Sequence, residues 1–249
     1  MYFKSGLLVW LFPVLLAVLS SCSVKEDRSG CPCRLTVAVS DLPVTPVEVV
    51  VSGEEFRDIR QAERDTVLMM PVPRPSVRLR AVHGAPADAG DILIPYGFQC
   101  PPLYLFDAEI DTSGETAFCQ VGLRKSFCTL TVVFSGPPGW ETPYSLEILG
   151  TVDGYLEGGL LSEGAFACRI SGAGTVRLPR QRDDSLRMDV LLQDNKVRTF
   201  ALGAYIAASG YDWTLPDLQD LTLEIDLSVT QITFRIGLWT ESVPLEIVI

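Results

Sequence analysis

The sequence predicts an all-β protein built from β-sandwiches, and three observations lead to this prediction. Apolar and polar residues alternate with a period of two along most of the chain, as in strands that bury one face. Turn-forming residues interrupt these segments at intervals of about 8–12 residues, a spacing typical of sandwiches. No long amphipathic helical pattern follows the first 21 residues.

The alternation defines the expected strands. It is clearest at 221–229, where aliphatic residues at every second position are separated by polar ones. The other expected strands cover 35–39, 47–51, 67–69, 77–79, 104–110, 130–134, 146–148, 166–170, 176–178, 186–192, 232–238 and 245–249.

A few segments break this rhythm. Phe56 and Ile59 lie three residues apart with charges between them, which predicts a two-turn surface helix within 54–63. The proline-rich run 71–75 fits an edge strand or an extended connection, because each proline removes a backbone donor. Residues 83–91 read as a loop, and Asp153-Gly154 as a turn.

The length of 249 residues fits two sandwiches better than one. We predict an N-terminal sandwich at 33–125 and a C-terminal sandwich at 126–249. The boundary is placed at Leu123–Ser126, which is expected to be a hinge without strand structure.

The N-terminus has the features of an export signal. Lys4 precedes an apolar run from Leu7 to Leu19, which is shorter than the ~20 residues of a membrane span. A membrane anchor is the alternative reading of this run. Leu19, Ser20, Ser21 and Cys22 follow the pattern of a bacterial lipobox. We therefore expect a lipoprotein signal peptide at 1–21, a lipid on Cys22 and a polar tether at 22–32, since several acyl chains give stable membrane attachment.

The segment after Cys22 resembles the FimB-type anchor lipoproteins of type V fimbriae, which are found in Gram-negative anaerobes. The matching features are the lipid cysteine, the acidic segment Glu26-Asp27-Arg28, and Cys31-Pro32 leading into a strand. The resemblance covers residues 22–41. It implies two tandem transthyretin-like antiparallel sandwiches and an outer-membrane location facing the cell surface, although the sequence leaves retention in the inner leaflet open.

The resemblance also implies a function without catalysis. Such a protein anchors and ends a fimbrium by engaging a stalk subunit, and its N-terminal strand is not cleaved from the rest. Subunits in these fimbriae join by strand exchange, a form of β-augmentation. Val243, Leu245, Ile247 and Ile249 are the candidate exchanged strand, and an ordinary last strand of the second sandwich is the alternative.

Composition argues against several other classes of protein. Twenty Lys and Arg against 31 Asp and Glu give a net charge of −11, which disfavours nucleic-acid binding. The single histidine, His83, has no neighbouring nucleophile motif, so we predict no enzyme activity. We expect no metal and no cofactor, because no ligand spacing or phosphate loop occurs.

The six other cysteines allow 15 pairings, which the sequence cannot distinguish. They are Cys31, Cys33, Cys100, Cys119, Cys128 and Cys168.

A second function remains open from the sequence alone, namely a glycan-binding surface lipoprotein of a nutrient-uptake system. Aromatic residues in loop-like segments could stack on sugar rings. The candidates are Trp140, Trp213, Trp239, Tyr155, Tyr205 and Tyr211.

Overall fold

The computed structural model describes residues 30–40, 43–87, 90–136, 142–227 and 231–244. Contacts divide the chain into two units, Met1–Pro32 and Cys33–Ile249. Only residues 30–32 of the first unit are described, so the architecture below concerns the second. Within the described residues, no helix combines the length and the hydropathy that a membrane span requires.

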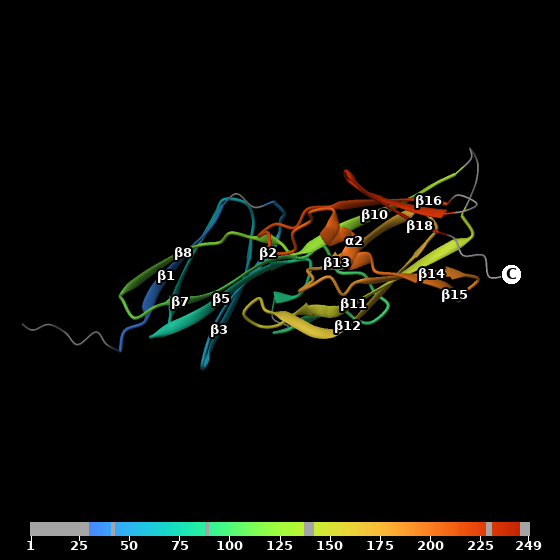
Figure 1. Ribbon diagram of the computed structural model, residues 1–249. Coiled ribbons are helices and arrows are strands. Elements are labelled where there is room, and N and C mark those ends of the chain that lie inside the picture. The colour runs from blue at the N-terminus through green and yellow to red at the C-terminus, as the bar shows by residue number, and fades with distance from the viewer. Residues whose placement is uncertain (1–29, 41–42, 88–89, 137–141, 228–230, 245–249) are drawn as a thin grey trace, which may run out of the picture. The chain divides into compact units, whose positions relative to one another are not determined.

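The N-terminal half forms two sheets that face each other across a shared core (Figure 1). One sheet has three strands in the order β4-β1-β8, and the other has five in the order β3-β2-β5-β7-β9. The strands are β1 (Cys33–Val39), β2 (Val47–Gly53), β3 (Phe56–Ala62), β4 (Thr66–Val72), β5 (Ser76–His83), β7 (Tyr104–Asp111), β8 (Thr116–Gln120) and β9 (Arg124–Lys125).

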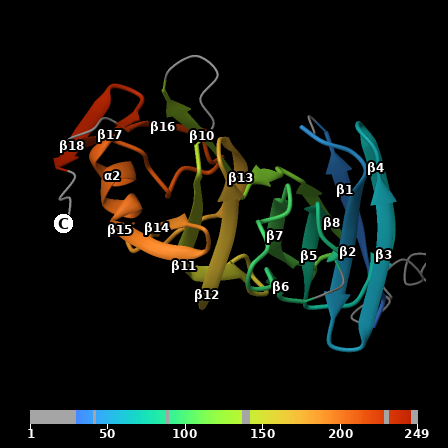
Figure 2. The ribbon, with the colours of Figure 1, turned by 90° about the vertical axis from the view of Figure 1, so that its right-hand side faces the viewer.

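The C-terminal half also forms two sheets (Figure 2). One has the order β13-β10-β16-β17-β18, and the other has the order β12-β11-β14-β15 with β6 paired to β11. The elements are β6 (Ile92–Leu93), β10 (Phe127–Ser135), β11 (Tyr144–Tyr155), β12 (Leu161–Ser171), β13 (Gly174–Pro179), β14 (Arg187–Leu192), β15 (Asn195–Phe200), α2 (Leu202–Ala208), β16 (Leu221–Leu227), β17 (Gln231–Ile236) and β18 (Trp239–Pro244).

The two halves repeat one strand plan. In the first half β1 pairs antiparallel with β4 and parallel with β8. In the second half β10 pairs antiparallel with β13 and parallel with β16. The sheet β3-β2-β5-β7 likewise corresponds to β12-β11-β14-β15. The second half differs by the added hairpin β17–β18 beyond β16, whereas β8 ends its sheet. The all-β sandwich architecture is therefore confirmed.

Alternating burial explains why these segments form strands. Leu35 and Val37 of β1 are fully buried, whereas Arg34, which precedes Leu35 and points to the opposite face, is exposed. Leu223 and Ile225 of β16 are buried, and Glu224 between them is exposed. Each sheet thus presents one apolar face to its partner sheet. The opposite face of the sheet β4-β1-β8 is not uniformly polar, because it exposes Val67, Met69 and Phe118.

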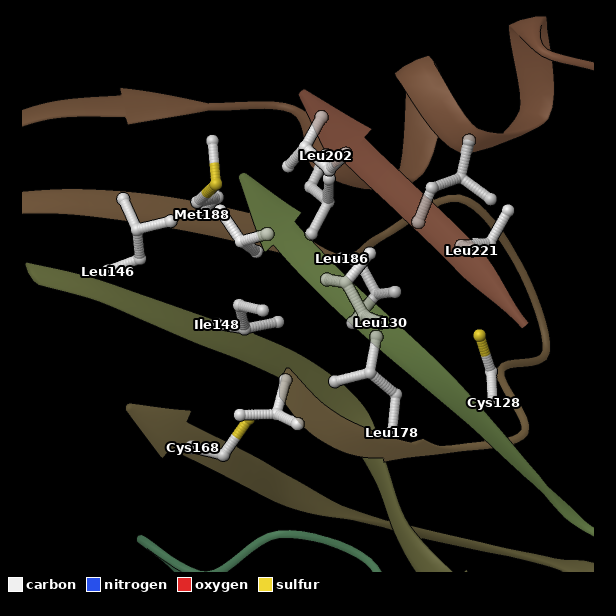
Figure 3. Packing of buried hydrophobic residues seen from close by; sticks show 14 of the residues in the cluster. Cys128, Leu130, Leu146, Ile148, Cys168, Leu178, Leu186, Met188, Leu202 and Leu221 are labelled. Atoms are coloured by element: carbon white, nitrogen blue, oxygen red, sulfur yellow. The ribbon is translucent and has the colours of Figure 1, made fainter. Parts of the chain in front are cut away.

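Each half has its own hydrophobic core. The N-terminal core consists of residues between Cys33 and Leu123. The C-terminal core extends from Phe127 to Ile236 and also includes Ile94 and Cys100 from the connection after β6. Figure 3 shows Leu130, Ile148 and Leu178 converging from three strands of this core.

The division at 125/126 stays a prediction, because Cys33–Ile249 form one compact unit.

Three local predictions were wrong. Residues 56–62 form strand β3 rather than a helix, because pairing with β2 satisfies the backbone. The position of β3 at the edge of its sheet also tolerates charged residues. Asp153-Gly154 lies inside β11, where irregular pairing bends the strand. Leu123–Ser126 is not free of strand structure, because β9 pairs with Leu105 and Tyr104 of β7. By contrast, β4 carries Pro71, the first proline of the 71–75 run, at a sheet edge, as expected.

Candidate assembly site

The strand that follows the tether occupies the centre of its sheet. Strand β1 has ladder partners on both sides, β4 and β8. Its four inward-facing side chains, Cys33, Leu35, Val37 and Val39, have exposed fractions of 0% to 1%. Removing this strand would open a slot through the N-terminal core and break both ladders. The N-terminal strand is therefore an integral part of the first sandwich.

The last described strand lies at an edge. Strand β18 ends its sheet and pairs only with β17 among the described strands, with Val243 opposite Ile232. Val243 is half-buried and packs against the C-terminal core. The hydroxyls of Thr233 and Ser242 lie 3.0 Å apart across the same pair. Val243 thus lies in the β17–β18 hairpin, and its exchange with a partner stays a prediction.

The other predicted site residues lie outside the described residues. These are the lipobox residues Leu19, Ser20 and Ser21, the lipid attachment site Cys22, and the C-terminal residues Leu245, Ile247 and Ile249. Lipidation and exchange of the C-terminal segment stay predictions.

Buried polar contacts join the two halves. Asp107 on β7 accepts a bond from Arg78 Nη1 at 3.1 Å and from the backbone N–H of Gly158 in the β11–β12 loop at 3.0 Å. Asp107 also lies 3.7 Å from Nε of the buried Arg80, whose pKa is lowered by burial despite this carboxylate. The side chain of Asp107 is only 3% exposed, so these bonds are shielded from water.

Tyr155 forms a second link in the same region. Its hydroxyl donates to the carbonyl of Ser126, just before β10, and accepts from the backbone N–H of Arg180 at 3.0 Å. Burial raises the pKa of Tyr155, so the hydroxyl stays protonated and able to donate. The start of β10 is thereby fixed to the sheet that contains β11.

The aromatic residues considered for glycan stacking are mostly packed inward. Tyr155 is 2% exposed and Trp213 is 9% exposed. The rings of Tyr205 and Trp239 lie 5.1 Å apart, and both pack against the C-terminal core. Trp140 lies outside the described residues. The residues proposed for sugar stacking therefore form packing contacts wherever they are described.

Two exposed aromatic residues were not singled out from the sequence. Tyr96 and Phe98 are 62% and 65% exposed and flank Gly97. Phe98 N–H donates to the Pro95 carbonyl at 3.0 Å, and Gly97 has a φ of 88°, which together define a type II turn. The sequence Pro-Tyr-Gly-Phe is a recognisable turn signal that could have located this pair.

Buried thiols dominate the cysteine set. Cys31 is exposed, and the other five described cysteines are buried and free. Burial raises the pKa of Cys100 to about 12 and that of Cys128 to about 11. Among the described residues, no cluster of His, Cys, Asp and Glu side chains could hold a metal ion. Buried thiols with raised pKa values stay protonated near neutral pH, so these cysteines are suited to core packing rather than to nucleophilic catalysis.

Comparison with known proteins adds a structural match. No family model and no curated protein matches the sequence. The fimbrial anchor protein Mfa2 from Porphyromonas gingivalis superposes with a TM-score of 0.58 at 12% identity, covering 84% of this chain and 99% of that chain. The chain has the fold of a fimbrial anchor protein.

Two further solved structures share this fimbrial-anchor fold. A candidate polysaccharide-binding protein (DUF1812) from Bacteroides thetaiotaomicron matches with a TM-score of 0.61 and 14% identity over 85% of this chain and 98% of that chain. A candidate adhesin from Bacteroides ovatus matches with a TM-score of 0.61 and 12% identity over 85% of this chain and 95% of that chain. At these identities the similarity establishes the fold.

Proposed function

We propose that this protein is a lipid-anchored protein of the outer membrane, facing the cell surface, that anchors and ends a fimbrium by engaging a stalk subunit. The observation that carries the proposal is the position of β1. Only the short predicted tether at 22–32 separates the predicted lipid cysteine, Cys22, from β1. Strand β1 is hydrogen-bonded to a neighbouring strand on each side, and its inward-facing side chains are buried in the core.

This arrangement suits a load-bearing attachment. A pull on the tether reaches the first sandwich at β1, and this strand is held by hydrogen-bonded ladders to both β4 and β8. An intact β1 also fills its own sheet, so the first sandwich offers no central slot to another subunit's strand. These two properties fit a subunit at the membrane end of a polymer.

The contact with the stalk is assigned to the C-terminal segment. Strand β18 provides an edge to which a partner strand can add, and residues 245–249 continue the apolar alternation beyond it. Val243 packs in the β17–β18 hairpin, so we assign the proposed strand exchange to Leu245, Ile247 and Ile249 alone.

The test compares three variants in the native bacterium. Cys22→Ala should release the protein and its fimbriae into the medium. Deletion of 245–249 should release fimbriae while the protein stays on the membrane with an unchanged melting temperature. Leu238→Ser, at a fully exposed position in the β17–β18 turn, is the matched control and should retain fimbriae. Normal fimbrial attachment in both Cys22→Ala and the deletion would overturn the proposal.

A further inference from the structure

The outer face of the sheet β4-β1-β8 carries apolar side chains that the described part of the chain leaves uncovered. Val67, Met69 and Phe118 have exposed fractions of 58%, 68% and 66%. Met69 of β4 and Phe118 of β8 both lie opposite Thr36 of β1, the strand between them (Figure 2). Residues directly opposite each other in a ladder point to the same face of a sheet, so Met69, Thr36 and Phe118 form one rung of this outer face.

The neighbouring rungs extend the same surface, because residues two positions apart in a strand point to the same side. Their members are Ala38, Val67 and Gln120 on one side and Arg34, Pro71 and Thr116 on the other. Within these three rungs Arg34 is the single charged residue, and there is no carboxylate. The chain as a whole has 31 Asp and Glu, so this face differs in character from the rest of the sequence.

The outer face of the partner sheet has the opposite character. Arg78 lies opposite Glu109 there, and Arg80 lies opposite Asp107. Asp107 is bonded to the β11–β12 loop of the second sandwich, and Tyr155 of β11 packs in a cluster with residues of this sheet. The second sandwich therefore covers the charged face, whereas the apolar face of β4-β1-β8 stays open.

The predicted tether keeps this open face near the membrane, and this step rests on the lipid attachment in the proposed function. Cys33, the first residue of β1, lies 11 residues after Cys22. An extended chain covers at most about 3.6 Å per residue, so β1 begins within about 40 Å of the lipid. A tethered face needs only weak affinity for the bilayer, because its binding is intramolecular.

The composition of the face matches the chemistry of a bilayer surface. Phe, Met and Val side chains can enter the boundary between head groups and acyl chains. Anionic head groups would repel carboxylates, and the three rungs contain none. Arg34, in the rung nearest the tether, can approach a lipid phosphate.

We propose that the outer face of β4-β1-β8 lies against the membrane that holds the lipid anchor. Met69, Phe118 and Val67 insert among the lipid head groups, and β1 lies between them. The lipid retains the protein, and the sheet face orients the first sandwich on the membrane.

The test uses the full-length lipidated protein, reconstituted in vesicles of phosphatidylethanolamine and phosphatidylglycerol. Cys31→Ser first removes the exposed thiol of the described cysteines. Thr116→Cys, on the proposed contact face, or Val197→Cys, at an exposed position of β15, then carries an NBD fluorophore. Nitroxide-labelled lipids should quench the label at 116 at least about twofold more than the label at 197, because docked side chains lie about 5–10 Å into the head-group boundary.

A pair of double variants tests the apolar side chains themselves. In the protein labelled at 116, Met69→Ser with Phe118→Ser should reduce quenching to the level seen at 197. Leu93→Ser with Leu160→Ser is the matched control, because it removes two exposed apolar side chains outside this face, and it should keep the quenching. All four positions are more than half exposed, so neither pair should lower the melting temperature.

Equal quenching of the two labels would overturn the proposal, as would unchanged quenching in the Met69→Ser, Phe118→Ser variant. A label at 116 that is shielded from aqueous iodide but not quenched by nitroxide lipids would show that a second copy covers the face, which also overturns it. Flotation of the protein with the vesicles separates the two proposals. Protein that does not float contradicts the lipid anchoring and this inference with it, whereas flotation without quenching at 116 contradicts only the membrane contact.

Discussion

The ammonium of Lys125 lies 2.6 Å from a carboxylate oxygen of Asp220, which also accepts the backbone N–H of Thr129 at 2.8 Å. The neighbouring Asp217 accepts the backbone N–H of Lys125 at 2.8 Å. The last residue assigned to the first sandwich is thus bound to the loop that leads into β16.

We expect these bonds to make the segment around Lys125 resistant to proteolysis. Trypsin should not cut first after Arg124 or Lys125, because β9 and the Asp217 bond hold this backbone. Asp217→Ala should increase early cleavage there, as read by mass spectrometry of the first fragments. Asp212→Ala is the control, because Asp212 bonds only to Thr214 in its own loop in the described contacts. Early cleavage after Lys125 in the unmodified protein would show that the segment behaves as a hinge.

Asp220 also predicts a pH dependence of stability. Burial acts to raise the pKa of Asp220, but bonds from Lys125 and Thr129 outweigh it and hold the pKa below its ordinary value. The carboxylate therefore contributes stability above the unfolded-state pKa of about 3.9, and this contribution is lost as the pH falls through the lower folded-state pKa.

Asp220→Asn should consequently lower the free energy of unfolding at pH 6 and converge with the unmodified protein near pH 2. Urea titrations at both values measure this difference. An equal loss at both pH values would show that packing, rather than charge, explains the effect.

The central strand β1 should be sensitive to truncation of its buried side chains. Leu35 is fully buried, so Leu35→Ala should destabilise the protein by about 2–5 kcal/mol. Thr36→Ala, on the half-exposed outer face of the same strand, should cost about 1 kcal/mol or less. Chemical denaturation of both variants measures the difference. Similar losses would contradict the burial pattern of β1.

Thiol reactivity should separate Cys31 from the other described cysteines. In the native protein the thiol reagent DTNB should react rapidly with Cys31 and slowly with the five buried thiols. Raising the pH to 9 should not release Cys100 or Cys128, because their pKa values are about 12 and about 11. Denaturant should expose all of them. Rapid reaction of several thiols in the native state would contradict the buried positions.

The sequence was informative where a strand buries one regular face. Strands β1 and β16 follow directly from alternation, because their inward residues are apolar and most of their outward residues are polar. Strand β3 was missed because an edge strand with charged side chains has little apolar alternation, and its structure depends on pairing with β2. The family resemblance implied two sandwiches of the same type, but the order of the strands in each sheet could not be derived, because pairing order leaves no mark in the sequence of either half.

The contacts between the two halves could not be predicted for a related reason. Arg78, Asp107 and Gly158 come from separate strands and loops, and their hydrogen bonds form only after the strands have paired. By contrast, the lipobox is a local motif, so the sequence alone supports that prediction.

The hairpin β17–β18 also bears on self-association. Without it, β16 would present an open edge with regularly alternating aliphatic residues, a template for pairing between copies. The hairpin moves the free edge to β18, which carries Glu241 and ends at Pro244, a residue with no backbone donor. In the first half the corresponding edge is β8, which is only five residues long. Both edges therefore disfavour strand pairing between two copies of this chain.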